Sequence, residues 1–351
     1  MSKFRLRDYP FFIKLFNWEF WPTYLVHAPT MIMWLWFACK ARALFFFTNV
    51  NPVIETGGVM GESKINILNR IPKDYLPKTI FVDPQNSSTN KLSQALSDQK
   101  MEFPLIVKPD IGERGFLVEK LESEEDLWAY FSETPVDFMI QEYITFPVEI
   151  SVLYYRLPNA DKGNITSLCI KDTLKVIGDG QSNIETLMRG IPRAILQLPR
   201  FQRKYPSLLK EVPKNGEEVV LEPIANHSRG TTFLNGNDYM DKQLEKVFDT
   251  IGFQMKDIYY GRFDMKCASI EKLKEGKDFK ILEFNGIASE PAHIYQPGYS
   301  IFQAYKDLWA HWTIIYQISK EQKKKGVPVM SWNDWRVHHR KYKQYLKAAI
   351  E

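Results

Sequence analysis

The sequence predicts an α+β protein with an aromatic-rich N-terminal region, a central region of mixed strands and helices, and a helical C-terminal tail. Residues 103–108 and 149–156 have the patterns of buried or half-buried strands, whereas residues 123–131 and 241–259 have helical periodicity. No repeat of fixed period and no low-complexity stretch occurs, which argues against a solenoid or a disordered chain.

Length and composition indicate a globular protein with a sizeable core. The 351 residues suffice for two or three domain-sized units, and 44% of them are hydrophobic and 25% charged. The net charge of +4, from 46 basic and 42 acidic residues, is too small to indicate a nucleic-acid partner. The cysteines are widely spaced and form no CxxC pair, which argues against disulfides and zinc and favours a reducing cytoplasm; they are Cys39, Cys169 and Cys267.

The N-terminus is basic, with Lys3, Arg5 and Arg7, and apolar residues follow it. Lys14 and Glu19 interrupt that apolar stretch and no small-residue cleavage site follows, so we predict no signal peptide.

The uncharged run at residues 20–39 is long enough to span a membrane and is rich in tryptophan. Pro22, His27 and Pro29 interrupt its first half, and Lys40 and Arg42 follow its end. We favour a buried or substrate-lining segment over an interfacial helix on a membrane, and we expect a true span least of all.

The first half of the chain is predicted to contain, in order, a turn at residues 56–58, a short helix at 62–69, a strand at 79–82, a loop and helix at 85–99, a strand at 103–108, a glycine-containing loop at 111–115, a helix at 123–131, and strands at 138–142 and 149–156. The second half is predicted to contain a strand at 167–176, a turn at 178–180, a helix that begins near Ser182 with capping-box spacing to Glu185, a helix at 241–259, a hairpin of strands 262–269 and 279–284, a helix at 300–319 and a basic helical tail at 323–351.

The hairpin carries the residues with the clearest chemistry. Alternation puts Arg262 and Asp264 on one face of the first strand, and Glu283 and Asn285 on one face of its partner. Carboxylate and amide oxygens at the ends of adjacent strands are suitable ligands for one or two Mg²⁺ ions that bind nucleotide phosphates. A salt-bridged surface hairpin is the alternative interpretation.

Two further segments suit a nucleotide. An apolar strand delivers Lys108 to the start of a loop that contains Gly112 and Gly115, where an ammonium and backbone N–H groups can surround phosphates. Residues 141–144 form a strand edge that can bind adenine, and Glu149 follows Glu142 closely enough to accept hydrogen bonds from a ribose. Taken singly, each segment is also explained by an ordinary structural role.

Taken together and in this order, the motifs resemble the ATP-grasp enzymes, in particular the D-alanine–D-alanine ligase branch. The similarity covers about residues 101–295 and includes Gly-Arg-Phe-Asp at 261–264, Leu-Glu-Phe-Asn at 282–285 and the interval from Glu142 to Glu149. Residues 176–182 and 225–232 are more similar to the ligase domain of cyanophycin synthetase and its relatives. The chain departs from the D-alanine ligases at residues 286–291 and in its N-terminal region, so D-alanine is not implied as the substrate.

The resemblance implies an ATP-grasp fold, in which two α+β subdomains clasp ATP. The domains would be an N-terminal, partly pre-ATP-grasp-like region (1–100), an ATP-grasp domain (101–300) with subdomains at 101–160 and 161–300, and C-terminal helices (301–351). The implied activity is an ATP-dependent ligase that joins a small-molecule carboxylate to an amine or a similar nucleophile through an acyl phosphate and releases ADP and phosphate.

The resemblance also implies the roles of the site residues. Arg262, Arg229 and Lys108 would be catalytic, and residues 226–235 would form a mobile lid. The implied cofactors are ATP and Mg²⁺, with Mn²⁺ as an alternative. The metal ligands would be Asp264, Glu283 and Asn285. The nucleotide would be bound by Lys64, Lys108, Gly112, Gly115, Gln141, Glu142, Tyr143, Ile144, Glu149 and Leu282.

Two other functions stay open at the sequence level. One is an ATP-grasp phosphotransferase, in which the acceptor keeps the phosphoryl group. The other is a membrane-associated nucleotide-binding scaffold, because the aromatic N-terminal segment or the basic tail suits peripheral contact at the inner face of a membrane. We expect the tail, including His338 and His339, to pack on the body as a helix with its histidines exposed.

Overall fold

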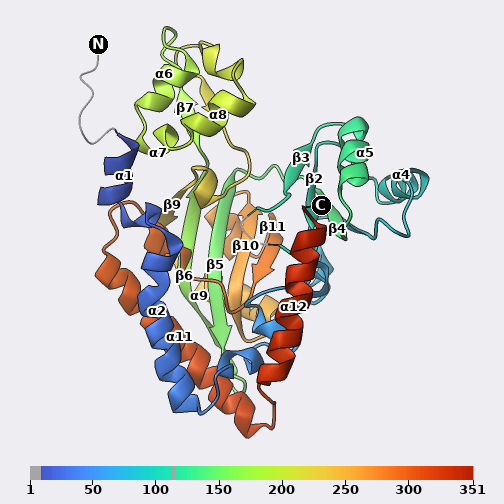
Figure 1. Cartoon of the computed structure of the whole chain (residues 1–351), viewed down its shortest axis with the longest axis vertical. Helices are drawn as coiled ribbons and strands as arrows, with labels where there is room; N and C mark the ends of the chain where they lie inside the picture. Colours follow the sequence, from blue (N-terminus) through green and yellow to red (C-terminus); the bar gives the residue numbers. More distant parts are fainter. Residues whose placement is uncertain (1–8, 113–114, 351) are drawn as a thin grey trace.

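Two antiparallel sheets organise the chain, and the computed structural model describes it over residues 9–112 and 115–350 (Figure 1). The predicted basic residues Lys3, Arg5 and Arg7, and residues 113–114 of the glycine-containing loop, lie outside the described residues. The predicted fold class is confirmed, because strands and helices are mixed and the C-terminal region is helical.

The first sheet has the strand order β1-β4-β2-β3. Its strands are β1 (Thr79–Val82), β2 (Leu105–Pro109), β3 (Glu119–Leu121) and β4 (Phe138–Glu142). Helices α4 (Thr89–Asp98) and α5 (Glu124–Glu133) bury Leu92 and Leu127 against strand residues such as Leu105 and Ile140. The predicted helix of residues 123–131 is α5, which begins at a capping box formed by Ser123 and Asp126.

The second sheet has the order β11-β10-β5-β6-β9. Its strands are β5 (Val148–Arg156), β6 (Gly163–Asp172), β9 (Thr232–Asn235), β10 (Tyr260–Cys267) and β11 (Phe279–Asn285). The helices α9 (Lys242–Gln254) and α10 (Ile270–Lys274) contribute Leu244, Phe248 and Leu273 to the same core as these strands. The other face of the sheet bears polar residues and borders a large cavity.

Alternation along β10 separates the two faces of this sheet. Phe263, Met265 and Cys267 belong to the core with α9, whereas Arg262 and Asp264 line the cavity. Each carboxylate and cation of β10 therefore points away from the apolar core.

A β-bulge corrects the phase of β11. Phe279 and Ile281 are in the core, so uninterrupted alternation would turn Glu283 toward the core as well. The pairing of β10 with β11 shifts register between Asp264 and Met265: Asp264 lies opposite Glu283, whereas Met265 lies opposite Ile281. Leu282 therefore has no partner residue on β10 and forms the bulge. Phe284 consequently enters the core, and Glu283 and Asn285 face the cavity.

A third unit lies beyond the second sheet, at the top of Figure 1. It contains β7 (Lys175–Ile177), β8 (Glu218–Val220), α6 (Ile184–Arg189), α7 (Pro192–Ile195) and α8 (Leu198–Lys204). The predicted strand at 167–176 is in fact two strands in different sheets, β6 and β7. The predicted helix near Ser182 begins at Ile184, because Asn183 rather than Ser182 provides the N-cap.

The N- and C-terminal helices flank the sheets. Helix α1 (Pro10–Phe16) leads to α2 (Thr23–Ala41), which lies beside α11 (Ile301–Lys324) (Figure 1). Helix α3 (Lys64–Leu68) packs beside β11 of the second sheet. The basic tail forms α12 (Trp332–Ala348) on the other side of the molecule, where Trp335 stacks on Phe45 at 4.4 Å. His338 and His339 are half-buried rather than exposed, and the His338 ring contacts the Met60 carbonyl oxygen at 3.0 Å.

Each sheet includes a strand that precedes a predicted boundary. Strand β1 of the first sheet precedes residue 100, and β5 of the second sheet precedes residue 160; the division into domains stays a prediction. The predicted helix at 241–259 ends at Gln254 because the chain turns there and Asp257 adopts φ +61°. The hairpin's charged loop contains α10.

The run at residues 20–39 has two different sides. Val26, Thr30, Phe37 and Ala38 are buried, in agreement with the favoured interpretation, but the opposite side of α2 is exposed. In the described part of the chain, every helix is too short or too polar to cross a bilayer.

Candidate active site

A cavity of about 1040 Å³ lies between the two sheets and extends to α2 and α11. Sites for drug-sized ligands usually occupy about 300–1,000 Å³, so the cavity has room for a nucleotide together with a second molecule. It brings together most of the predicted site residues, including Lys64, Lys108, Arg262, Asp264, Glu283 and Asn285.

Lys108 stands at the junction of the two sheets. Its ammonium donates to the Gln141 side-chain oxygen at 3.1 Å and to the Leu282 carbonyl oxygen on β11 at 2.9 Å. Burial lowers the pKa of Lys108 to about 8, against the attraction of Glu283 and Asp264. The three predicted residues Lys108, Gln141 and Leu282 thus form one hydrogen-bonded group on the cavity wall.

Lys64 approaches the same space from the N-terminus of α3. Its ammonium donates to the Gly112 carbonyl oxygen and lies 3.6 Å from the Glu283 carboxylate. The loop's Asp110 fixes this helix, because its backbone and side-chain oxygens accept from the backbone N–H groups of Lys64 and Ile65 at 3.1 and 2.9 Å. Two lysines from different elements therefore face the two carboxylates of the hairpin.

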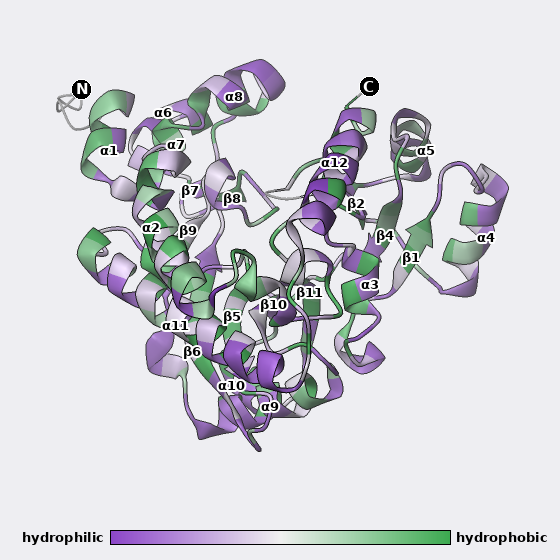
Figure 2. Ribbon diagram, turned by 60° about the horizontal axis from the view of Figure 1, so that its bottom comes forward, coloured by the Kyte–Doolittle hydropathy of each residue, from purple (hydrophilic) through white to green (hydrophobic). Residues whose placement is uncertain are grey.

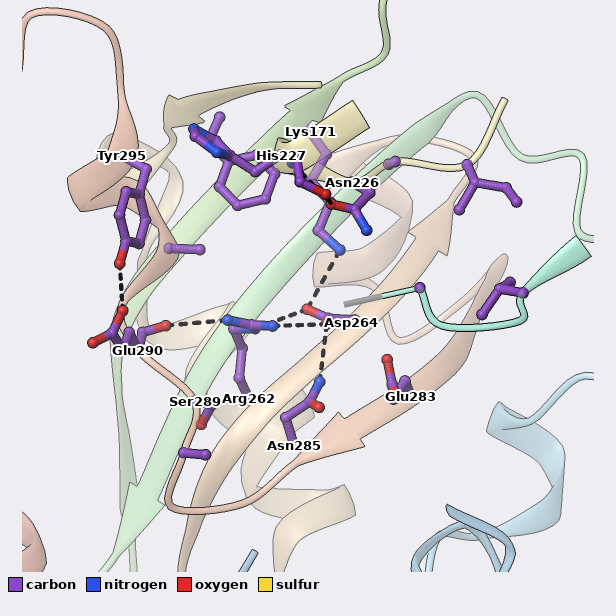
Figure 3. A pocket seen from close by; sticks show the side chains of 18 of the residues that line it. Lys171, Asn226, His227, Arg262, Asp264, Glu283, Asn285, Ser289, Glu290 and Tyr295 are labelled. Atoms are coloured by element: carbon purple, nitrogen blue, oxygen red, sulfur yellow. Dashed lines mark hydrogen bonds and ion pairs between the residues drawn. The ribbon is translucent and has the colours of Figure 1, made fainter. Parts of the chain in front are cut away.

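Asp264 is the most heavily paired acidic group of the site (Figure 3). Arg262 donates to both of its carboxylate oxygens at 3.0 Å, and the Asn285 amide donates at 3.0 Å. The Lys171 ammonium lies 3.5 Å away. Burial opposes ionisation of Asp264, but Arg262 and Lys171 outweigh it and hold its pKa well below the usual range.

The predicted metal ligands come together on the cavity face. Asp264 lies directly opposite Glu283 in the strand pairing, and Arg262 lies opposite Asn285. Two ionisable carboxylates and one amide oxygen are chemically suited to Mg²⁺, which keeps several waters and takes few protein ligands. Within the described residues, no group of three or more His, Cys, Asp or Glu side chains is placed to hold a metal ion.

Lys171 on β6 was missed by the sequence analysis. Its ammonium bridges Glu149 at 3.4 Å and Asp264 at 3.5 Å. Although burial opposes the charge, these two carboxylates raise the pKa of Lys171. Glu149 consequently has a cationic partner already, and burial raises the pKa of its carboxyl group. Strand alternation on β6 was the one available signal, since Lys171 follows the apolar residues Leu168, Cys169 and Ile170 near the polar end of the strand.

The predicted adenine segment is the connection between the two sheets. Its first two residues end β4 and the next two follow that strand, and the Ile144 carbonyl oxygen accepts from Lys266 at 3.1 Å. The Tyr143 ring lies under the ammonium groups of Lys120 and Lys266, at 4.7 and 4.9 Å. Glu142 accepts from the Lys78 backbone N–H at 3.2 Å, so its carboxylate turns toward β1.

The two predicted loops meet across the cavity. The Arg229 guanidinium donates to the Gly115 carbonyl oxygen at 3.1 Å and lies 3.8 Å from Glu222. Gly115 has φ +75°, and a Cβ there would lie 2.9 Å from the Asn226 amide nitrogen. The predicted lid of residues 226–235 contains a 3-10 turn, His227–Arg229, but its last part is strand β9 of the second sheet.

The cavity continues past Arg262 into a polar recess that sequence reasoning did not find. Glu290 lies 3.2 Å from His27 of α2 and accepts from the Tyr295 hydroxyl (Figure 3). On the facing wall Glu19 pairs with Arg193 at 2.6 Å and with His227 at 3.1 Å. Except for Glu290 and Tyr295, the paired residues are far apart in the sequence, so no local motif connects them.

Comparison with known proteins gives matches among solved structures alone. No protein-family model and no curated protein matches the chain. VanG D-Ala:D-Ser ligase from Enterococcus faecalis is 13% identical over 73% of this chain and 62% of its own, with a TM-score of 0.40. D-alanine–D-alanine ligase from Bacillus anthracis complexed with ATP is 13% identical over 77% of this chain and 70% of its own, with a TM-score of 0.44.

A bifunctional glutathione synthetase from Pasteurella multocida is 14% identical over 73% of this chain and 38% of its own, with a TM-score of 0.38. The chain therefore spans less than two thirds of the VanG ligase and of the glutathione synthetase.

Proposed function

We propose that the chain is an ATP-dependent ligase that phosphorylates a small-molecule carboxylate and joins it to an amine. The observation that carries the proposal is the convergence of two lysines, Lys64 and Lys108, on a pair of facing carboxylates, Asp264 and Glu283, beside Arg262 in one cavity. Cations for phosphates and hard oxygen ligands for magnesium are the two requirements of phosphoryl transfer from ATP.

In this proposal the nucleotide lies between the sheets. Lys108 and Lys64 would neutralise phosphate oxygens, and the backbone near Gly112 would follow the phosphate chain. The segment at residues 142–144 would hold the base. Asp264, Glu283 and Asn285 would hold Mg²⁺, which when bound would offset the negative charge of the transferred group.

The recess past Arg262 would hold the two substrates. A free carboxylate is a poor electrophile, and transfer of the γ-phosphoryl group would give an acyl phosphate that an amine can attack. The Arg262 guanidinium, positioned by Asp264, would stabilise charge on the tetrahedral carbon's oxygen. Glu290 and His27 offer a carboxylate and an imidazole at 3.2 Å, a pair suited to hold an ammonium and accept its proton.

The test is ADP release from Mg²⁺-ATP, screened against pooled carboxylates and amines. A ligase requires one of each, and a carboxylate labelled with heavy oxygen would deliver one labelled atom to inorganic phosphate. A stable phosphorylated acceptor without any amine requirement would establish a phosphotransferase and contradict the proposal.

A further inference from the structure

Helix α2 presents an apolar stripe to solvent. Its exposed residues recur at helical spacing over about four turns, and they are Tyr24, Leu25, Ala28, Met31, Ile32, Leu35, Trp36 and Cys39. The opposite side of the helix is buried through Val26, Thr30, Phe37 and Ala38. A helix that is apolar on all sides is normally buried on all sides. The exposed stripe of α2 is therefore an apolar surface that no other part of the described chain buries.

The stripe continues onto neighbouring helices. Helix α1 exposes Phe11 and Phe16, and α11 exposes Phe302 and Trp309. Figure 1 shows α1, α2 and α11 together on one side of the molecule, and Figure 2 shows that the α2 ribbon is mostly hydrophobic. Exposed apolar side chains gathered on one side of a molecule in this way favour an interaction site for a protein or a membrane.

The charges around the stripe are basic. From Tyr9 to Leu44 the chain has one carboxylate, Glu19, and its side chain is 6% exposed and paired with Arg193. The exposed charged residues of this stretch are Lys14 near the start of the stripe and Lys40 and Arg42 beyond its end. In the sequence, Lys3, Arg5 and Arg7 precede α1. This surface is therefore complementary to an anionic partner.

The shape of the stripe favours lipid over a protein partner. Tyr24, Ile32 and Trp36 are 73%, 70% and 59% exposed, so they stand out from the helix and do not line a groove. A lipid headgroup layer accommodates protruding side chains without a preformed pocket. Tryptophan, tyrosine and basic residues beside an apolar helix face are also the residues that favour the membrane interface.

We propose that α2 is an interfacial helix that lies on an anionic lipid bilayer. The stripe would be immersed at the level of the headgroups, and Lys14, Lys40 and Arg42 would contact lipid phosphates. The inner side of the same helix contributes Val26, His27 and Thr30 to the cavity wall, so the bilayer would lie next to the substrate recess. The proposal does not depend on the function proposed above.

Cys39 provides a probe on the stripe itself. It is the exposed one of the chain's three cysteines, all of which are described. Burial raises the pKa of Cys169 to about 12 and that of Cys267 to about 11, so a thiol-reactive dye should label Cys39 selectively. An environment-sensitive dye at Cys39 would report entry of the stripe into lipid.

The experiment adds vesicles of phosphatidylcholine and phosphatidylglycerol in equal parts to the labelled full chain, with pure phosphatidylcholine as comparison. We expect a blue-shifted, brighter dye with the anionic vesicles and co-sedimentation of the unlabelled protein. The double variant Ile32→Asp/Trp36→Asp should bind these vesicles at least about tenfold more weakly. Val212→Asp changes an apolar residue that is 52% exposed in the third unit, and it should bind as the unchanged protein does.

Circular dichroism and urea unfolding check that the variants are folded. Absence of vesicle binding by the unchanged protein would overturn the proposal, as would equal binding by the double variant. Dimerisation of the vesicle-free protein in sedimentation velocity, abolished by the same double variant, would also overturn it, since the stripe would then be covered by a second copy.

Discussion

Lys108 joins the two sheets through one ammonium group, and its charge depends on pH. Burial lowers its pKa to about 8, so the ammonium loses its proton as the pH rises through about 8. We expect the affinity for Mg²⁺-ATP to fall over that interval, because the neutral amine no longer attracts phosphate.

Lys108→Met should lose this pH dependence and reduce ATP turnover by about 100-fold or more. A fluorescent ATP analogue titrated at several pH values measures the first effect. Lys175→Met is the matched control, because Lys175 pairs with Glu218 outside the cavity. An unchanged affinity across the interval would show that Lys108 does not contact the nucleotide.

The two carboxylates of the hairpin should respond differently to loss of charge. Asp264→Asn leaves the buried Arg262 and Lys171 without their shared anion, so we expect unfolding free energy to fall by about 3 kcal/mol. Glu283→Gln removes one partner of Lys64 at 3.6 Å and should leave stability nearly unchanged while abolishing Mg²⁺-dependent turnover.

Urea unfolding and ADP release measure the two effects, and Glu218→Gln on β8 serves as a control for loss of a surface carboxylate. Full activity of the Glu283→Gln variant would show that Glu283 is not a metal ligand.

At the residue scale, local motifs predicted Lys64, Lys108, Asp264, Glu283 and Asn285, and the structure brings these residues to one cavity. Their roles in binding and catalysis stay predictions. Lys171 was missed because a single lysine that follows apolar strand residues carries no motif. The pair of Glu19 and Arg193 was missed because 174 residues separate them.

At the scale of elements, sequence patterns located strands and helices, but they did not predict which residues of β11 face the core and which face the cavity. Strands β1 and β4 have the predicted bounds, since apolar runs between turn residues define them. The bulge at Leu282 was not predicted, because it arises from pairing with β10. Because of that bulge, Glu283 faces the cavity and not the core.

The glycine turn at residues 57–58 fixes the N-terminal region to the end of β11. Gly58 has φ +87°, and a Cβ there would lie 2.6 Å from the Gly286 Cα. We expect Gly58→Ala to lower the unfolding free energy by about 2 kcal/mol more than Gly298→Ala. Gly298 is the matched control, because it has φ +81° with no atom within 4 Å of its Cβ position. Equal losses in urea unfolding would mean that the turn can move away from β11.

At the scale of the whole molecule, the α+β fold was predictable because strand and helix patterns are each local. The arrangement of the sheets was not, since β1 joins β4 and β5 joins β10 across long stretches of chain. The third unit was not predicted as a separate unit. The sequence patterns indicated one strand, one turn and one helix there, and the separate core forms only because β8 returns to pair with β7.

The most direct test of the central claim is ADP release by the purified chain with Mg²⁺-ATP and pooled carboxylates and amines, beside Glu283→Gln. The account predicts turnover that requires both a carboxylate and an amine and is lost in the variant. Turnover that persists in Glu283→Gln, or that needs no amine and leaves a stable phosphorylated product, would contradict it.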